Sequence, residues 1–267
     1  MGLCSSRCST MMMIIDVDNM SLAMANACPK IKRGMIHVWT VHLDNPDETQ
    51  LMLANTLSAE ELLRAGRFHF ERDCQRFIAC RLALRKILAG YLRIEPAQVR
   101  FSYGKHGKPT LGPTFLNSGL QFNISHSHGI ALVACSYQRE IGVDIERIRP
   151  LPGIEQIVER YFAHAERIAL QLLPTRKRTT TFFDWWTCKE AYLKALGKGL
   201  AYPLDRIDVS MVTEQPTTLV SADSPGQAGS WTVRLLSTVP GYAAALVVGD
   251  EGHCHPTGRP VPRSDLV

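Results

Sequence analysis

Two short segments of the chain carry residue types that could do chemistry together. The first, residues 142–146, reads Gly-Val-Asp-Ile-Glu and contains the carboxylates of Asp144 and Glu146. The second, residues 186–194, contains Glu190 and Lys194. Magnesium prefers carboxylate oxygens and fills its remaining positions with substrate phosphates and water. Three acids and a lysine therefore indicate a centre where a metal ion and a phosphate group meet.

The two segments must be placed differently for their side chains to meet. The first alternates apolar residues with glycine or acids, which predicts a strand with both acids on one face. The second predicts a helix, because Trp186, Glu190 and Lys194 recur every four residues on one side. Each pattern has a simpler explanation, since half-exposed strands often alternate apolar and polar residues. Glu before Lys at this spacing is also a common surface pair, worth about 0.2–0.5 kcal/mol.

Other polar groups accompany these segments. The run Phe122-Asn123-Ile124-Ser125-His126-Ser127 predicts a strand whose end offers a hydroxyl and an imidazole to a phosphate. Residues 104–109 predict a glycine-rich turn that contains Lys108. The region before them is basic, and its cations are Arg64, Arg67, Arg72, Arg76, Arg81, Arg85 and Lys86.

Composition narrows the class of protein. The chain has 267 residues, of which 45% are hydrophobic and 21% charged, and this excludes a disordered or collagen-like chain. No apolar run is long enough to span a bilayer, so we expect no membrane partner. The net charge of +5 favours an anionic partner, which leaves nucleic acid, a phosphorylated cofactor and an acidic protein open. Eight cysteines without a CxxC pair indicate a reducing, cytoplasmic setting.

The periodicity along the chain predicts alternating strands and helices. Strands are expected near residues 35–41, 100–103, 121–125, 130–137, 141–146, 207–212, 231–237 and 242–248, and helices near residues 58–70, 71–92, 154–161 and 186–194. Residues 128–134 resemble residues 240–247, each with a glycine before an apolar strand, which suggests two similar halves.

These segments, in this order, resemble the 4'-phosphopantetheinyl transferase superfamily of the surfactin-synthetase-activating (Sfp-like) type. The resemblance spans residues 35–248 and rests on four motifs: Gly107-Lys108-Pro109, the run at residues 122–127, the strand at residues 142–146, and residues 186–199. It implies an α+β fold, a pseudo-dimer of two similar α/β halves in one chain, each with a small, mostly antiparallel sheet packed on helices.

The resemblance also implies a division of the chain. Residues 1–34 would be a disordered extension, residues 35–146 a half that binds the nucleotide of coenzyme A, and residues 147–250 a half that holds the metal and carrier site. Residues 251–267 would be a disordered tail. The active site would then lie where the two halves meet.

The implied reaction transfers 4'-phosphopantetheine from coenzyme A to a serine of an apo acyl or peptidyl carrier protein and releases adenosine 3',5'-bisphosphate. This is the activity of a holo-[acyl-carrier-protein] synthase, which activates fatty acid, polyketide or nonribosomal peptide synthases. Asp144, Glu146 and Glu190 would hold Mg²⁺ or Mn²⁺. Glu190 and Lys194 would be catalytic, as the base and as the cation on the pyrophosphate. The cofactor-binding residues would be Arg64, Arg76, Lys108, Ser125, His126 and Lys194.

One departure from the family pattern concerns the first helix. Two lysines often reach the 3'-phosphate there, whereas this chain has Glu61 and Arg64 at those positions. Arg64 can still bind phosphate, and Arg67 could substitute for the other lysine, but Glu61 would repel phosphate if it pointed inward. Glu166, by contrast, falls where related proteins also have an acid after the second-half helix, and the resemblance assigns it no role.

Two other functions are compatible with parts of the sequence. A metal-dependent nuclease also gathers acids and a lysine, but its acid-x-lysine element normally lies on a strand, whereas Glu190 and Lys194 have helical spacing. A carrier-binding module without activity would not need every metal-site residue that is present. We therefore expect coenzyme A and an acidic carrier protein as partners of a monomeric enzyme, and no nucleic acid.

Overall fold

The structure is a computed structural model. It describes residues 30–44, 56–199, 202–212, 215–219, 231–237 and 239–250, together with the backbone of residues 13–17. The tail expected at residues 251–267 lies outside these ranges. Within them, no helix is both long enough and apolar enough to cross a membrane.

The chain is built from two halves with the same order of main elements. The N-terminal half contains β2 (Met35–His42), α3 (Glu71–Leu92), β5 (Leu120–Ser127) and β6 (Ile130–Tyr137). The C-terminal half contains β7 (Ile141–Arg147), α6 (Thr175–Leu196), β9 (Trp231–Leu235) and β10 (Tyr242–Gly249). The sheets have the orders β1-β2-β6-β5 and β7-β10-β9-β8. The predicted pseudo-dimer of α/β halves is thus confirmed, and the repeated segments contribute to β6, which lies between β2 and β5, and to β10, which lies between β7 and β9.

Each half also contains elements that the other half lacks. The N-terminal half adds β1 (Met13–Val17), α2 (Ala59–Ala65), and a hairpin of β3 (Phe101–Tyr103) and β4 (Pro109–Leu111). The C-terminal half adds α4 (Ile154–Tyr161), α5 (His164–Leu172) and β8 (Thr217–Leu219). Short 3₁₀ helices lie at Pro96–Gln98, Pro113–Ser118 and Leu204–Arg206.

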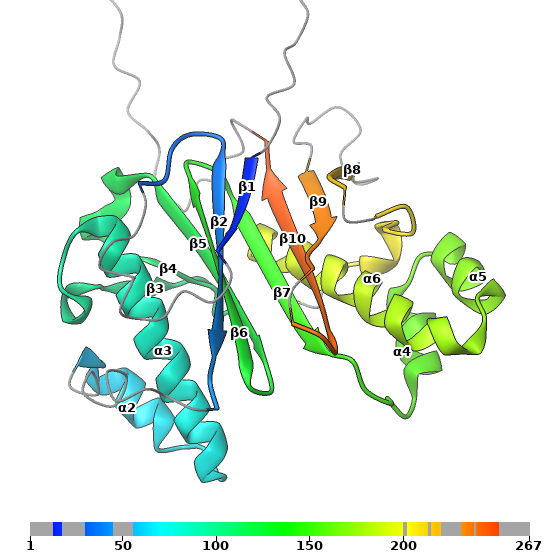
Figure 1. The fold of residues 1–267 in the computed structure, drawn as a ribbon, viewed down its shortest axis with the longest axis horizontal. Coiled ribbons are helices and arrows are strands. Elements are labelled where there is room, and N and C mark those ends of the chain that lie inside the picture. Colours follow the sequence, from blue (N-terminus) through cyan, green and yellow to red (C-terminus); the bar gives the residue numbers. More distant parts are fainter. Residues whose placement is uncertain are drawn as a thin grey trace, which may run out of the picture.

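The elements are layered with the two sheets in the middle. Apolar residues of β2, β6, β7 and β10 form one shared core between the sheets. A second core packs α3 on the outer face of the N-terminal sheet, and a third packs α4, α5 and α6 on the outer face of the other. Figure 1 shows α2 and α3 on one flank and α4, α5 and α6 on the opposite flank. Four cysteines of the described residues are free thiols; Cys80, Cys135 and Cys188 are buried, and Cys74 is half-buried.

Local sequence explains how the helices that matter for the site begin and end. Ser58 caps α2 by accepting a hydrogen bond from the Glu61 amide, while the Glu61 carboxylate accepts from the Ser58 amide. Helix α6 ends at Gly197, whose φ of 66° is in the left-handed region that glycine enters without strain. This stop places the last turn of α6, with Lys194, directly beside β7.

Three features differ from the sequence-based expectations. Residues 13–17 form β1, parallel to β2, so this part of the N-terminal extension has regular structure. Strand β7, expected at the end of the N-terminal half, pairs with β10 in the sheet of the C-terminal half. Residues 207–212 were predicted as a strand but follow a 3₁₀ turn without pairing, because they are fastened instead by side chains, as described below.

Candidate active site

The two predicted segments meet where β7 packs on α6. Ile141, Val143 and Ile145 lie in the core between the sheets, so the alternate residues of β7 face the helix. Gly142 makes the close approach feasible, because a Cβ atom there would lie 2.0 Å from the carbonyl oxygen of Ala191. The contact brings Asp144 of β7 and Lys194 of α6 together.

Asp144 is the most tightly held acid of the site. Its Oδ1 accepts hydrogen bonds from Lys194 Nζ at 2.6 Å and from Ser125 Oγ at 2.8 Å. Lys194 Nζ also donates to Ser125 Oγ at 2.7 Å. Asp144 is only 3% exposed, yet its Oδ2 is buried without a hydrogen-bond partner among the described residues. A buried carboxylate oxygen that lacks a donor is costly, so this atom is suited to a ligand.

Glu146 lies two residues further along the same face. Its Oε2 accepts a hydrogen bond from Ser127 Oγ at 2.8 Å. Burial raises the pKa of Glu146, and the neighbouring charge of Asp144 adds to the rise, while the bond from Ser127 opposes it. The predicted pairing of both acids on one face is therefore correct, and β5 supplies a hydroxyl to each of them.

Glu190 is the acid with the most perturbed protonation in the cluster. Burial raises its pKa to about 7, and the charges of Asp144 and Glu146 contribute, whereas Lys194 opposes the rise. Like charges raise a pKa in this way only when they are close enough to interact. The three predicted acids thus act on one another electrostatically, and Glu190 is poised to exchange a proton near neutral pH.

The donor set fits a hard divalent cation in its chemistry. It offers carboxylate oxygens, one of which is the unpaired Oδ2 of Asp144. A cation would also relieve the repulsion that raises the pKa of Glu190. In the described part of the chain, however, no three His, Cys, Asp or Glu side chains converge closely enough to hold a metal as they stand. Asp144 instead has the Lys194 ammonium on its other oxygen.

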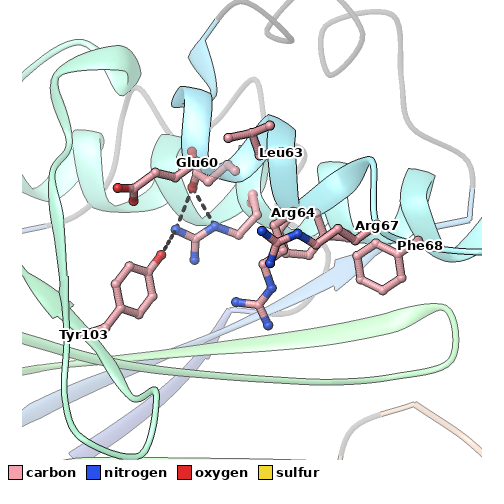
Figure 2. A pocket seen from close by; sticks show the side chains of 9 residues that line it. Glu60, Leu63, Arg64, Arg67, Phe68 and Tyr103 are labelled. Atoms are coloured by element: carbon pink, nitrogen blue, oxygen red, sulfur yellow. Dashed lines mark hydrogen bonds and ion pairs between the residues drawn. The ribbon is translucent and has the colours of Figure 1, made fainter.

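Candidate nucleotide-binding residues line two neighbouring hollows on the N-terminal half. The larger, of about 600 Å³, contains Arg64 and Arg67 between aromatic side chains. Figure 2 shows both arginines between Tyr103 on one side and Phe68 on the other. The smaller, of about 240 Å³, contains Arg76 and His126. Phe68 and Phe77 line both hollows, so Arg64, Arg76 and His126 are brought into one region as predicted.

His126 and Arg76 differ in how freely they can meet a ligand. The His126 side chain is exposed, but partial desolvation and the positive charges of Lys194 and Arg64 lower its pKa. Arg76 donates two hydrogen bonds to Asp44, from Nε at 2.5 Å and from Nη2 at 2.9 Å. Because Asp44 is half exposed, this pair is screened by water and readily exchanged for another anion.

Glu61 does not act as a free negative charge toward the larger hollow. Its carboxylate accepts hydrogen bonds from Arg81 at 2.6 Å and from Arg85 at 2.8 Å, and the residue is 4% exposed. Burial alone would raise the pKa of Glu61, but the bonds from Arg85, Ser58 and Arg81 outweigh it, so the pKa is lowered. The expected repulsion of phosphate is therefore removed by two guanidinium groups.

Lys108 is placed away from both hollows. Its Nζ donates to the carbonyl oxygen of Ala195 at 2.9 Å and to Glu140 Oε2 at 3.3 Å. These contacts tie the β3–β4 hairpin to the last turn of α6. A role of Lys108 in nucleotide binding stays a prediction, and its ammonium would have to leave these partners.

Sequence reasoning missed one buried ion pair beside the site. Lys189 and Glu166 have fully buried side chains, and Nζ lies 2.9 Å from Oε2. Lys189 also donates to the carbonyl oxygens of Leu204 and Ile207, while Glu166 accepts from the amides of Ala163 and Val209. The pair thus fastens the segment predicted as a strand at residues 207–212. No local pattern reveals it, because its members are 23 positions apart.

Comparisons with known proteins match this architecture half by half. The model of the 4'-phosphopantetheinyl transferase superfamily matches residues 140–247, and that of the 4'-phosphopantetheinyl transferase N-terminal region matches residues 44–138. The N-terminal match ends at residue 138 and the superfamily match begins at residue 140, so β7 falls in the superfamily match. This agrees with the pairing of β7 in the sheet of the C-terminal half.

Individual relatives cover most of the chain. The 4'-phosphopantetheinyl transferase HetI of Nostoc sp. is 44% identical over 80% of this chain and 88% of its own length. The 4'-phosphopantetheinyl transferase Sfp of Bacillus subtilis is 27% identical over 78% of this chain and 90% of its own. A crystal structure of a holo-(acyl-carrier-protein) synthase from Bacillus anthracis in complex with CoA covers 41% of this chain and 94% of that chain, with 21% identity and a TM-score of 0.32. The chain belongs to the 4'-phosphopantetheinyl transferase superfamily, which confirms the family predicted from its motifs.

Proposed function

We propose that this protein transfers the 4'-phosphopantetheine arm of coenzyme A to a serine hydroxyl of an apo carrier protein. The observation that carries the proposal is the meeting of Asp144, Glu146, Glu190 and Lys194 where β7 packs on α6, within a chain of this family. Such a centre suits phosphoryl transfer, in which catalysis consists mainly of positioning and charge stabilisation.

In the proposed reaction, the serine oxygen of the carrier bonds to the phosphorus atom that bears the pantetheine arm. The bond from that phosphorus to the bridging oxygen breaks, and adenosine 3',5'-bisphosphate leaves with the electron pair. Glu190 takes the serine proton, directly or through a water molecule, because a carboxylate held within the cluster can act as a general base. Lys194 turns from Asp144 toward the pyrophosphate oxygens and stabilises their charge.

We further propose that Asp144, Glu146 and Glu190 hold Mg²⁺, or Mn²⁺ in its place. When bound, the cation would neutralise charge on the pyrophosphate and on the leaving bisphosphate. The unpaired Oδ2 of Asp144 supports this assignment. The closure of the carboxylates around the ion would require small movements of their side chains, because they do not converge on one point without it.

The nucleotide end of coenzyme A would occupy the two hollows on the N-terminal half. Arg64 and Arg67 would contact the 3'-phosphate from the larger hollow, with Arg76 and His126 near it from the smaller. Ser125 would link the two regions, because its hydroxyl already contacts Lys194 and Asp144 while its neighbour His126 lines the hollow. An acidic carrier surface, a monomeric state and a cytoplasmic location remain predictions.

Intact-protein mass spectrometry tests the proposed transfer. Incubation with coenzyme A, Mg²⁺ and apo carrier proteins should add one phosphopantetheine mass to a carrier. A carrier whose acceptor serine is replaced by alanine is the matched control and should gain nothing. No mass gain across apo acyl and peptidyl carriers would overturn the proposal. Cleavage of DNA by the protein in Mg²⁺, with no transfer to any carrier, would favour the nuclease alternative.

A further inference from the structure

Strand β5 supplies a row of polar side chains to the edge of β7. Asn123, Ser125 and Ser127 alternate along β5 and therefore share one face. Asn123 Oδ1 accepts a hydrogen bond from the Val143 amide at 3.0 Å, and the two serines contact the acids that follow on β7. This row joins the two sheets where their backbones do not pair.

The hydroxyl of Ser127 has its direction set by the backbone. Its Oγ accepts a hydrogen bond from the Arg147 amide at 3.1 Å, which leaves the hydroxyl hydrogen free to donate. The acceptors in reach are Glu146 Oε2 at 2.8 Å and His128 Nδ1 at 3.3 Å. The shorter bond to the charged oxygen is the stronger one, so the hydrogen points to Glu146.

Glu146 depends on this bond more than Asp144 depends on any single partner. Asp144 is held by both Ser125 and Lys194 and is nearly inaccessible. Glu146 has a longer side chain and is half buried, and among the described residues Ser127 is the one hydrogen-bonding partner of its carboxylate. The bond uses Oε2 and leaves Oε1 for another partner. Ser127 itself is buried, so the surrounding protein atoms restrict its side chain.

We propose that Ser127 is a positioning residue that holds Glu146 in place for a divalent cation. The inference rests on the proposed function, because it concerns the same cation. Residues that orient a metal-binding carboxylate through a hydrogen bond typically change metal affinity or activity by about 10–100-fold when they are replaced. Ser127 would do so from β5, a strand of the opposite half, and would thereby align the nucleotide-binding half with the metal site.

The test compares Ser127→Ala with Ser127→Thr and with Ser136→Ala. Threonine keeps the hydroxyl and should rescue the effect. Ser136 is the matched control, because it is also a buried strand serine, but its Oγ donates to the carbonyl oxygen of Arg139 at 2.6 Å and has no hydrogen bond to a carboxylate in the described part of the chain. Urea unfolding would show whether Ser127→Ala and Ser136→Ala lose similar stability.

Mn²⁺ is the probe, and electron paramagnetic resonance measures its binding to the full chain with coenzyme A present. We expect the Mn²⁺ dissociation constant to rise about 10–100-fold in Ser127→Ala and to stay unchanged in Ser136→Ala. Transfer assays should show a matching rise in the Mg²⁺ concentration needed for half-maximal rate. Equal Mn²⁺ affinity in Ser127→Ala and wild type would overturn the inference alone. Absence of Mn²⁺ binding by the wild type would overturn the proposed metal and the inference with it, even if transfer occurred.

Discussion

Two charged clusters lie on different faces of helix α6 and begin at adjacent residues, Lys189 and Glu190. The Lys189–Glu166 cluster is complete, because each charged group has its opposite charge and two hydrogen bonds to backbone groups: Lys189 donates to carbonyl oxygens and Glu166 accepts from amides. The Glu190 cluster is incomplete, with an unpaired oxygen on Asp144 and a pKa of about 7 for Glu190. The Lys189 and Glu166 side chains are fully buried, whereas Glu146 and Glu190 are half-buried, so the incomplete cluster is also the more accessible one.

The difference teaches that hydrogen-bond completeness distinguishes a charged group that supports the fold from one that serves a reaction. A buried ion pair with every donor and acceptor satisfied is costly to break but gains nothing from a ligand. A cluster with an open oxygen and crowded carboxylates gains stability when a cation enters. The Glu61–Arg81–Arg85 group belongs to the first kind, which explains why an acid is tolerated beside the larger hollow.

The largest effect should come from removal of the divalent metal, which acts on the incomplete cluster alone. EDTA should reduce transfer to below detection, because the pyrophosphate charge would be left without its neutralising cation. Added Mg²⁺ or Mn²⁺ in excess of the chelator should restore the rate. Thermal unfolding in EDTA serves as the control and should show the fold intact. An unchanged transfer rate in EDTA would remove the metal from the account.

Replacement of Lys189 by methionine should break the complete cluster. The uncompensated Glu166 carboxylate would remain fully buried, which typically costs about 3–5 kcal/mol of unfolding free energy. Urea unfolding measures this loss. The double variant Lys189→Met/Glu166→Gln removes the charge and should recover part of the stability. Transfer per folded molecule should stay near wild type, whereas its complete loss in a folded variant would place Lys189 in the reaction.

Gly142→Ala should push β7 away from α6, and the incomplete cluster requires these two elements to be in contact. The new Cβ atom would meet the carbonyl oxygen of Ala191 and the amide of Ala195, both of which are backbone atoms. Overpacking of this kind costs about 1–3 kcal/mol, and Lys194 should move away from Asp144. Gly241→Ala would meet no atom within 4 Å and is the control for crowding, although its positive φ adds its own strain. Wild-type transfer and stability in Gly142→Ala would contradict the close packing.

The smallest effect is a change in the pH dependence of stability in EDTA. The pKa of Glu190 is about 7 in the folded protein, above its ordinary value of 4.5. Between these values the native state binds more protons than the unfolded state, so unfolding free energy falls as pH rises. Glu190→Gln should flatten this fall, while Glu146 keeps part of it. Urea unfolding across this range measures the slopes, and identical slopes would show that the pKa of Glu190 is not raised.

The sequence predicted the parts of the fold and site that depend on periodicity. The alternation around Asp144 and the spacing of Glu190 and Lys194 gave the correct strand, helix and shared faces. The strand predicted at residues 122–127 is also present, and its adjacent residues Ser125 and His126 lie on opposite faces, one buried and the other exposed.

The rest depends on contacts between distant residues, which no local pattern contains. The ion pair of Lys189 with Glu166, and the neutralisation of Glu61 by Arg81 and Arg85, arise only when separate helices and turns pack. The sheet that β7 joins is likewise set by pairing with β10 near the end of the chain. Ser127 stood inside a motif from the start, but its role becomes visible only beside Glu146.

The central claim, that the incomplete cluster performs the transfer, is tested most directly by the single-turnover rate of Glu190→Gln at saturating coenzyme A. The substitution keeps the size of the side chain and removes its charge and its capacity to accept a proton. We predict a rate about 10²–10⁴-fold below wild type. The affinity for coenzyme A, measured by calorimetry, should stay close to the wild-type value. A wild-type rate in this variant would contradict the claim and remove Glu190 from the mechanism.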